Sequence, residues 1–193
     1  MSTTETSKTD EECCPPFDPS KYQDGNNNYK LITWKDKPFV VDGARCLFHV
    51  PLAFGKAVTR AMKKIEQAGA EVPKEEFMIL SDCSSPWWSD VLVSTSKGNV
   101  EGAEVKMLSG IYLAKAFEGS YSNMGKWVQE IDELATEVKR TTSDEKESIA
   151  DKEVVQVVKQ KVQEIYFYYP TCPKCAKKYG KNYVVVFTKI SEV

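Results

Sequence analysis

The stretch AEVKMLSGIYLAKAFEG, residues 103–119, has the composition and length of one long β-strand. Successive side chains of a strand point to opposite faces of a sheet. One face carries bulky apolar residues that are expected to meet helices: Val105, Met107, Ile111, Leu113 and Phe117. The other face carries smaller residues between a tyrosine and a carboxylate: Lys106, Leu108, Gly110, Tyr112, Ala114, Ala116 and Glu118. This second face is predicted to floor a pocket with open volume above it; a solvent-exposed sheet face is the alternative.

The same order of elements occurs twice along the chain. The first set is a strand at 44–54, a helical pattern over 53–68, and strands at 75–82 and 89–96. The second set is the strand at 103–119, an apolar helical face over 124–138, and strands at 162–170 and 182–190. The sequence therefore predicts an α+β fold of two β-α-β-β units, about 44–100 and 103–190.

Two segments are expected to lie outside these units. Residues 1–43 are predicted to be a disordered segment followed by an extended arm, with short strands near Leu31–Trp34 and Phe39–Val41. Residues 139–161 are charged and are expected to form a solvated helical insertion. The folded domain is thus predicted to span residues 44–193.

The charge balance separates classes of partner. Lys and Arg number 26, Asp and Glu number 28, and the formal net charge is -2. A protein that binds nucleic acid directly normally has a basic excess, so such binding is not expected. The sequence has no run as long as a membrane span and no signal-peptide pattern at residues 1–12, so a cytoplasmic protein without membrane contact is expected.

Several stretches resemble a known family. AFEGSY (116–121) opens the second helix, and Glu164-Ile165-Tyr166 lies on the penultimate strand, as in the GyrI-like small-molecule-binding domain. The resemblance implies that duplicated β-α-β-β units form a curved antiparallel sheet with helices on one face and a ligand cleft between the halves. Three further stretches, CCPPFDPSK (13–21), HVPLAFGK (49–56) and TCPKCAKKYGKNYVV (171–185), are similar to the GyrI-like subfamily of cyclopropanoid cyclopropyl hydrolases.

The resemblance and the strand pattern together suggest ligand-binding residues. Matching Glu164 and Tyr166 to the family turns both toward the cleft, and Tyr168 shares their face. Trp87 and Trp88 are adjacent, so at least one is expected to be exposed, and Trp87 is the one chosen. The predicted ligand-binding residues are mostly aromatic, as suits a planar hydrophobic molecule: Trp87, Tyr112, Tyr121, Trp127, Glu164 and Tyr166. For Trp127, a place in the core is the alternative.

The activity implied by the resemblance is hydrolysis of a strained cyclopropane in a DNA-alkylating compound, without a cofactor. Such ring opening needs a water molecule delivered to carbon and stabilisation of the charge that forms on a conjugated carbonyl. Glu118 is the candidate for the first role and Tyr168 for the second. The only histidine, His49, is expected to be structural, which argues against a zinc hydrolase with histidine ligands.

The cysteines permit a second kind of site. Cys172 and Cys175 form a single C-x-x-C, which is expected to lie in a surface hairpin and lacks the context of a redox motif. With Cys13 and Cys14 they could bind one structural zinc that pins the N-terminal arm to the last hairpin, although adjacent cysteines are poor joint ligands. Cys46 and Cys83 are expected to be small core residues.

Three functions remain open at this stage. The first is a hydrolase that binds planar hydrophobic xenobiotics in an aromatic cage and detoxifies them. The second is a protein that binds or sequesters such molecules without chemistry, since one fold can serve both purposes. The third is a protein-interaction module.

Overall fold

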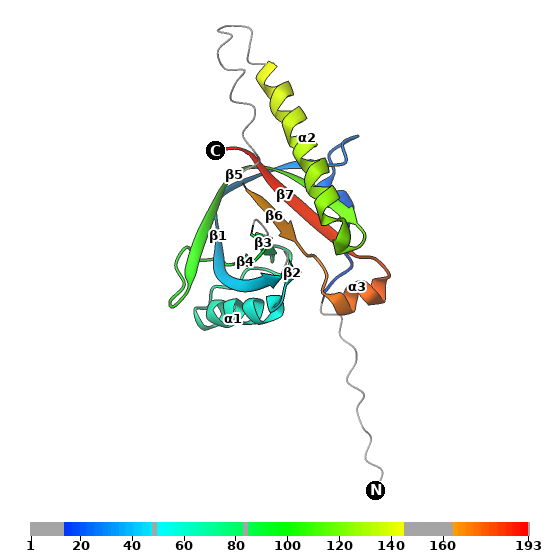
Figure 1. Ribbon diagram of the computed structural model, residues 1–193. Helices are drawn as coiled ribbons and strands as arrows, with labels where there is room; N and C mark the ends of the chain where they lie inside the picture. Colours follow the sequence, from blue (N-terminus) through cyan, green and yellow to red (C-terminus); the bar gives the residue numbers. More distant parts are fainter. Residues whose placement is uncertain (1–13, 48–49, 83–84, 145–163, 193) are drawn as a thin grey trace.

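The computed structural model of the chain describes residues 14–47, 50–82, 85–144 and 164–192 (Figure 1). Its strands are β1 (Lys30–Leu47), β2 (Val50–Pro51), β3 (Ile79–Asp82), β4 (Trp88–Ser94), β5 (Glu104–Glu118), β6 (Ile165–Tyr168) and β7 (Tyr183–Ser191). Its α-helices are α1 (Phe54–Gln67), α2 (Met124–Asp144) and α3 (Pro173–Tyr179), with short 3₁₀ helices η1 (Pro19–Tyr22) and η2 (Tyr121–Asn123).

The sheet closes into a barrel. The strand order is β1-β4-β3-β6-β7-β5, and β5 pairs again with β1, so six antiparallel strands form a ring while the short β2 flanks β1. A closed sheet leaves no unpaired edge between these strands. The predicted α+β class and the curved antiparallel sheet are confirmed at this level, whereas the duplication of the units and the ligand cleft stay predictions.

Strand β1 corrects the predicted arm. The segments near 31–34 and 39–41, expected to be two short strands, belong to one strand that pairs with both β4 and β5. The register shifts between Trp34 and Lys37, where Asp36 has a φ of 46°. The backbone N–H of Asp36 donates to Ser109 Oγ at 2.8 Å. A bulge of this kind interrupts the apolar alternation, which is why the sequence pattern broke into two pieces.

Large side chains fill the barrel interior. Its core consists of residues from all six strands: Trp34, Phe39, Met78, Leu80, Leu92, Leu108, Tyr112, Ala114, Tyr166, Val185 and Phe187. The small-residue face of β5 points into this interior, as its parity predicted. The open volume expected above that face is not found there, because Tyr112 and Ala114 are fully buried and Leu108 is 2% exposed.

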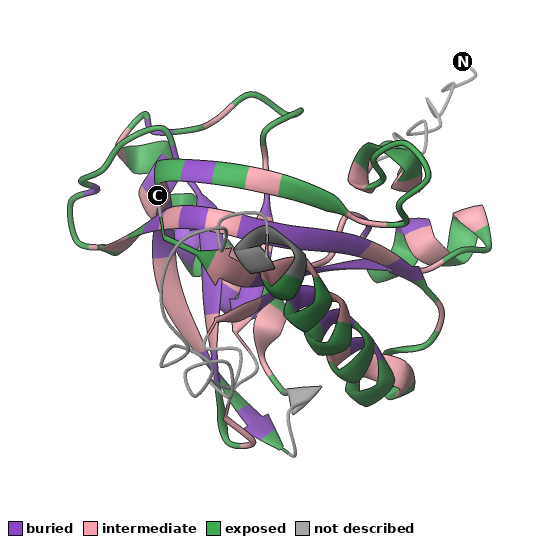
Figure 2. Cartoon of the chain, turned by 90° about the horizontal axis from the view of Figure 1, so that it is seen from above, coloured by how far each residue is buried: buried purple, intermediate pink, exposed green. Residues whose placement is uncertain are grey.

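The two longer helices cover the outside of the barrel. On α1, Ala57, Ala61 and Ile65 are buried against the outer side chains of β1 and β4. On α2, Trp127 and Ile131 are buried against outer residues of β5 and β7. Figure 2 shows the result, with buried residues along the strands and exposed residues on the outward side of α2. No helix in the described part of the chain has both the length and the apolar character needed to span a bilayer.

The N-terminal segment from residue 14 to η1 lies against the end of the barrel near α3. Phe17 stacks on Tyr22 with 5.8 Å between ring centroids, and it also meets Tyr183 of β7 at 5.2 Å. Tyr22 contacts Phe187 edge-on at 5.9 Å. This segment, residues 14–22, is called the N-terminal arm below. Its aromatic rings join the interior core from outside the strands.

Candidate functional site

A tyrosine and a glutamate meet at the edge of the barrel interior. Tyr112 on β5 donates its hydroxyl hydrogen to Glu164 Oε2 across 3.2 Å. The sheet register brings them together: Tyr112 is paired with Lys189 on β7, and the backbone N–H of Lys189 donates to the Glu164 carbonyl at 3.1 Å. Glu164 precedes β6 and is half-buried, while Tyr112 is fully buried. The carboxylate thus lies at the boundary between the packed interior and solvent.

A lysine and a second tyrosine extend this arrangement. Lys106 Nζ donates to the Tyr166 hydroxyl at 3.0 Å and lies 5.4 Å from the centre of its ring. The rings of Tyr166 and Tyr112 are 6.4 Å apart. The four residues Lys106, Tyr112, Glu164 and Tyr166 are called the interior network below. The sequence had placed three of them in the ligand site, and the structure brings those three together.

Lys106 is the member that sequence reasoning missed as a functional residue. It shares the inward face of β5 with Tyr112 but lies six positions earlier. Gly110, with a φ of 142°, lies between them, and the β5–β7 register shifts between Ile111 and Tyr112. Such irregularities bend a strand, so its inward side chains converge more than in a straight one. The shared parity was visible in the sequence, but the bend was not.

Burial and charge set the protonation of this network. Burial, reinforced by the nearby Glu164 carboxylate, raises the pKa of Tyr112 far above the ordinary range of a phenol. Burial also raises the pKa of Tyr166, although its hydrogen bond from Lys106 acts in the opposite direction. Burial alone would lower the pKa of Lys106, but the hydrogen bond to Tyr166 and electrostatic attraction to Tyr166, Glu164 and Asp82 outweigh it and raise that pKa. At neutral pH the network therefore holds two neutral phenols and an ammonium group.

Aromatic rings pack against the interior network. The Trp34 ring lies 4.6 Å from that of Tyr112 and 5.0 Å from that of Phe187. Trp34 is 6% exposed and comes from the part of β1 that had been assigned to the arm, so it was absent from the predicted site. These rings present flat apolar faces beside a hydrogen-bonded carboxylate.

Among the described residues, no hydrogen bond joins either predicted catalytic residue to the interior network, although Tyr168 packs against the same core as Tyr112 and Tyr166. Glu118 ends β5, its side chain is 52% exposed, and its Oε2 lies 3.8 Å from Lys181 Nζ. Tyr168 points into the barrel close to the N-terminal arm, where burial, and after it the electrostatic effect of Cys14, raises the pKa of its phenol. The structure therefore does not bring Glu118 together with Glu164 and Tyr112.

The remaining predicted ligand residues are dispersed. Trp87 is 60% exposed in the loop before β4. Trp127 is buried under α2, stacked on Phe117 at 5.4 Å, and so occupies the outer core rather than the interior. Tyr121 in η2 donates its hydroxyl hydrogen to Asn182 Oδ1 at 3.2 Å and meets the Tyr169 ring edge-on.

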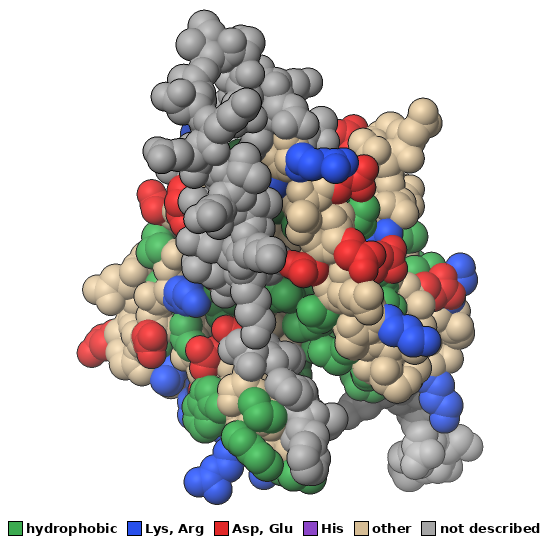
Figure 3. Space-filling view, turned by 45° about the horizontal axis from the view of Figure 1, so that its top comes forward, with side chains coloured by type: hydrophobic (Ala, Val, Ile, Leu, Met, Phe, Trp, Pro, Cys, Tyr) green, Lys and Arg blue, Asp and Glu red, His purple; other side chains and the backbone are tan. Residues whose placement is uncertain are grey.

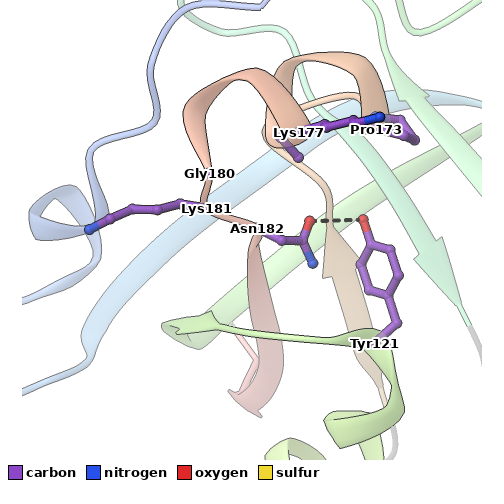
Figure 4. Close-up of a pocket in the computed structure, with 7 residues that line it drawn as sticks. Tyr121, Pro173, Lys177, Gly180, Lys181 and Asn182 are labelled. Carbon is purple, nitrogen blue, oxygen red and sulfur yellow. Dashed lines mark hydrogen bonds between the residues drawn. The ribbon is translucent and has the colours of Figure 1, made fainter.

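Two open surface hollows stand out among the described residues. One, of about 450 Å³, lies between η2 and α3 (Figure 4) and is lined by Tyr121, Pro173, Ala176, Lys177, Gly180, Lys181 and Asn182. The other, of about 380 Å³, lies on α1 beside Lys56 and Arg60. Neither hollow is lined by a residue of the interior network. On the face drawn in Figure 3, Lys and Arg side chains are scattered among Asp and Glu.

Three thiols meet at the opposite end of the N-terminal arm from Tyr22. The Sγ atoms of Cys14, Cys172 and Cys175 all lie within 4.8 Å of one another. The backbone N–H of Cys172 donates to Cys14 Sγ at 3.4 Å, and the Tyr179 hydroxyl donates to the Cys14 carbonyl at 2.6 Å. The C-x-x-C motif lies, as expected, in the connection between the antiparallel strands β6 and β7. The sequence did not predict that this connection holds a short helix, α3, which Pro173 at its first position helps to initiate.

Some cysteine and histidine predictions fall on other parts of the chain. Cys46 is buried, at 6% exposure, which agrees with its predicted core position. Cys13, Cys83 and His49 lie outside the described residues, as do positions 145–161 of the predicted insertion. The four-thiol zinc site therefore stays a prediction, of which three thiols are seen to be close together.

Comparison with known proteins adds one finding. A family model described as bacterial hydrolase matches residues 4–148 and 144–190. The matched ranges include the interior network and the three-thiol cluster. Among curated proteins, none matches the chain.

Proposed function

Because the chain belongs to the bacterial hydrolase family, we propose that it hydrolyses a small molecule with Glu164 as its catalytic carboxylate. The observation that carries the proposal is the Tyr112–Glu164 hydrogen bond, beside a lysine-bound Tyr166 and against buried aromatic rings. A half-buried carboxylate that is fixed by a neutral phenol is oriented for proton transfer. Glu118, more than half exposed and next to Lys181, lacks this support.

The substrate class follows from the same surroundings and from the resemblance to the cyclopropanoid cyclopropyl hydrolases. It is a planar, hydrophobic compound that carries a strained cyclopropane conjugated to a carbonyl. Trp34, Tyr112 and Tyr166 offer rings for such a molecule to contact. Because these rings are packed together, the substrate has to part them, with its reactive end at the half-buried Glu164. Detoxification of DNA-alkylating compounds is the corresponding role.

The proposed reaction is the addition of one water across the strained ring. Glu164 takes a proton from a water molecule as the water oxygen bonds to a cyclopropane carbon. The ring C–C bond breaks, and its electron pair moves through the conjugated system to the carbonyl oxygen. The Lys106 ammonium and the Tyr166 hydroxyl lie side by side and stabilise that negative oxygen. Return of the proton completes the net addition of one water.

A mass-spectrometric assay tests the proposal. Purified protein is incubated with a spirocyclopropane alkylator, and the product is compared for the wild type, Glu164→Gln and the control Glu118→Gln. We expect a catalytic gain of one water, slowed about 100-fold or more by Glu164→Gln and changed less than about threefold by Glu118→Gln. Equal loss in both variants, or loss in Glu118→Gln alone, would remove Glu164 from its proposed role.

The same assay distinguishes a binding protein from an enzyme. Trp34 lies against Tyr112, so a ligand that parts these rings alters tryptophan fluorescence. Saturable quenching with the compound recovered unchanged would contradict hydrolysis and leave a protein that sequesters planar hydrophobic molecules.

A further inference from the structure

The three-thiol cluster is separate from the interior network and serves no step of the proposed hydrolysis. Its members come from two distant segments, since Cys14 and Cys172 are 158 positions apart in the chain. We propose that Cys14, Cys172 and Cys175 bind a zinc ion that fastens the N-terminal arm to α3. This inference does not depend on the proposed function.

The donor set points to zinc. Thiolate sulfur is a soft ligand, and a tetrahedral arrangement of cysteine sulfurs is characteristic of zinc sites. Zinc–sulfur bonds of about 2.3 Å place neighbouring sulfurs about 3.8 Å apart in a tetrahedron. The three Sγ atoms already lie within 4.8 Å of one another, so shifts of about 1 Å or less bring them to three corners of such a tetrahedron. The two-residue spacing of Cys172 and Cys175 is that of a structural zinc motif.

The local contacts hold the cluster in place before any metal binds. The hydrogen bonds from the Cys172 N–H to Cys14 Sγ and from the Tyr179 hydroxyl to the Cys14 carbonyl join the arm to both ends of α3. Cys175 is 3% exposed, and Cys14 and Cys172 are half-buried. A preorganised set of ligands lowers the entropic cost of binding an ion. N–H donation to a ligating sulfur is also a usual support of such a centre.

The consequence for the fold is a cross-link. The arm contributes Phe17 and Tyr22 to the end of the barrel, next to Tyr183 and Phe187. A metal that joins residues so distant in the sequence restricts the unfolded chain and stabilises the folded one. Thiolates donate strongly to the metal, so an ion held mainly by them is a weaker Lewis acid for hydrolysis. The zinc is therefore expected to hold the arm and not to take part in catalysis.

Metal analysis of the full chain is the direct experiment. The protein is purified under reducing conditions without chelator, and its zinc is measured by elemental mass spectrometry. A parallel sample is loaded with cobalt(II), whose thiolate-to-metal charge-transfer absorption reports sulfur ligation. The variants are Cys14→Ser and Cys46→Ser. Cys46 is the matched control because it is a buried thiol outside the three-thiol cluster.

We expect about one zinc per chain and a charge-transfer band in the wild type and in Cys46→Ser. Cys14→Ser should bind zinc at least about 100-fold more weakly in competition with a chelator, because loss of a ligand exceeds the loss from an outer contact. Substoichiometric zinc with no cobalt band, or a Cys14→Ser variant that binds as tightly as the wild type, would overturn the proposal.

A measurement on the wild type covers the case in which Cys14→Ser does not fold. Chelation should lower the unfolding temperature, and added zinc should restore it, since a ligand that binds the native state stabilises that state. An unfolding temperature unaffected by chelator and by zinc would contradict the proposal that a zinc ion fastens the N-terminal arm to α3.

Discussion

Two glutamates on the barrel show how differently the same residue type can be situated. Glu164 is half-buried, accepts a hydrogen bond from Tyr112 and lies in a network with Lys106. The Glu118 side chain is 52% exposed, and its Oε2 lies 3.8 Å from Nζ of the exposed Lys181. Glu118 ends β5 and Glu164 immediately precedes β6, and by parity both continue an inward-pointing strand face. The comparison teaches that the face of a strand does not by itself place a side chain in the interior, because the end of an inward face is open to water.

Two tyrosines, one close to each of these glutamates, differ in burial in the same way. Tyr112 is fully buried among aromatic rings, and Tyr121, close to Glu118 in the chain, is 43% exposed. Both hydroxyls donate a hydrogen bond, to Glu164 and to Asn182 respectively. Matched substitutions at these two positions therefore measure how much burial in the interior adds to the free energy of unfolding.

The largest expected effect comes from removing the rings. Tyr112→Ala should lower the free energy of unfolding by about 3–5 kcal/mol, the cost usual for a buried aromatic side chain. Tyr121→Ala should lower it by about 1 kcal/mol or less, because half of that ring already meets solvent. Denaturant titration at neutral pH measures both. Equal losses would mean that the interior around Tyr112 is loosely packed, which would contradict the complete burial of this side chain.

Removing only the hydroxyl sharpens the comparison. Tyr112→Phe keeps the ring but leaves the Glu164 carboxylate without its phenol donor, which should cost about 1.5–3 kcal/mol for a bond to a charged group. Tyr121→Phe removes a half-exposed bond to an amide and should cost about 0.5 kcal/mol. The same denaturant titration applies. A neutral Tyr112→Phe would indicate that water replaces the phenol at Glu164 without loss.

Alkaline pH offers a third test of the buried phenol. An unfolded tyrosine loses its proton near pH 10, whereas burial and Glu164 raise the pKa of folded Tyr112 well above that. Above about pH 10 the unfolded chain therefore holds fewer protons than the folded one, and stability falls as pH rises, by at most about 1.4 kcal/mol per pH unit for one group. Below pH 10 this contribution is fully present.

Two variants show which tyrosine causes this fall in stability with rising pH. Tyr112→Phe should reduce the fall in stability between pH 10 and pH 11.5 more than Tyr121→Phe does, although burial raises the pKa of Tyr121 as well. Unfolding free energies measured across this pH range in the two variants give the answer. An unchanged slope in Tyr112→Phe would show that its phenol is not protected from ionisation.

Much of the fold could be predicted from periodicity. The helices α1 and α2 and the strands β5, β6 and β7 lie where the apolar patterns placed them, because each buries one regular face. The pattern failed in β1, where the bulge at Asp36 breaks the alternation and hides a long strand. It also missed α3, whose seven residues are too few to establish a helical period.

The candidate site was predicted only in part, for a related reason. Strand parity correctly grouped Tyr112 with the inward face of β5, and Glu164 with Tyr166 before and on β6. Strand parity could not show that the barrel closes by pairing of β1 with β5. This pairing brings Trp34 against Tyr112. Barrel closure and strand bending depend on pairing between segments that are distant in the sequence. From one sequence, such pairing can be inferred only from apolar alternation, and bulges interrupt that alternation.

The smallest effect is expected where the comparison began, at Glu118. Glu118→Gln removes an exposed charge whose attraction to Lys181 is screened by solvent, so the unfolding midpoint should not change beyond experimental error. Raising the salt concentration should likewise leave the difference between variant and wild type unchanged, because there is little attraction to screen. Hydrolysis should persist as well, since no described contact joins Glu118 to the interior network. A clear loss of stability or activity in Glu118→Gln, matching that of Glu164→Gln, would mean that the open end of the inward face is part of the site after all.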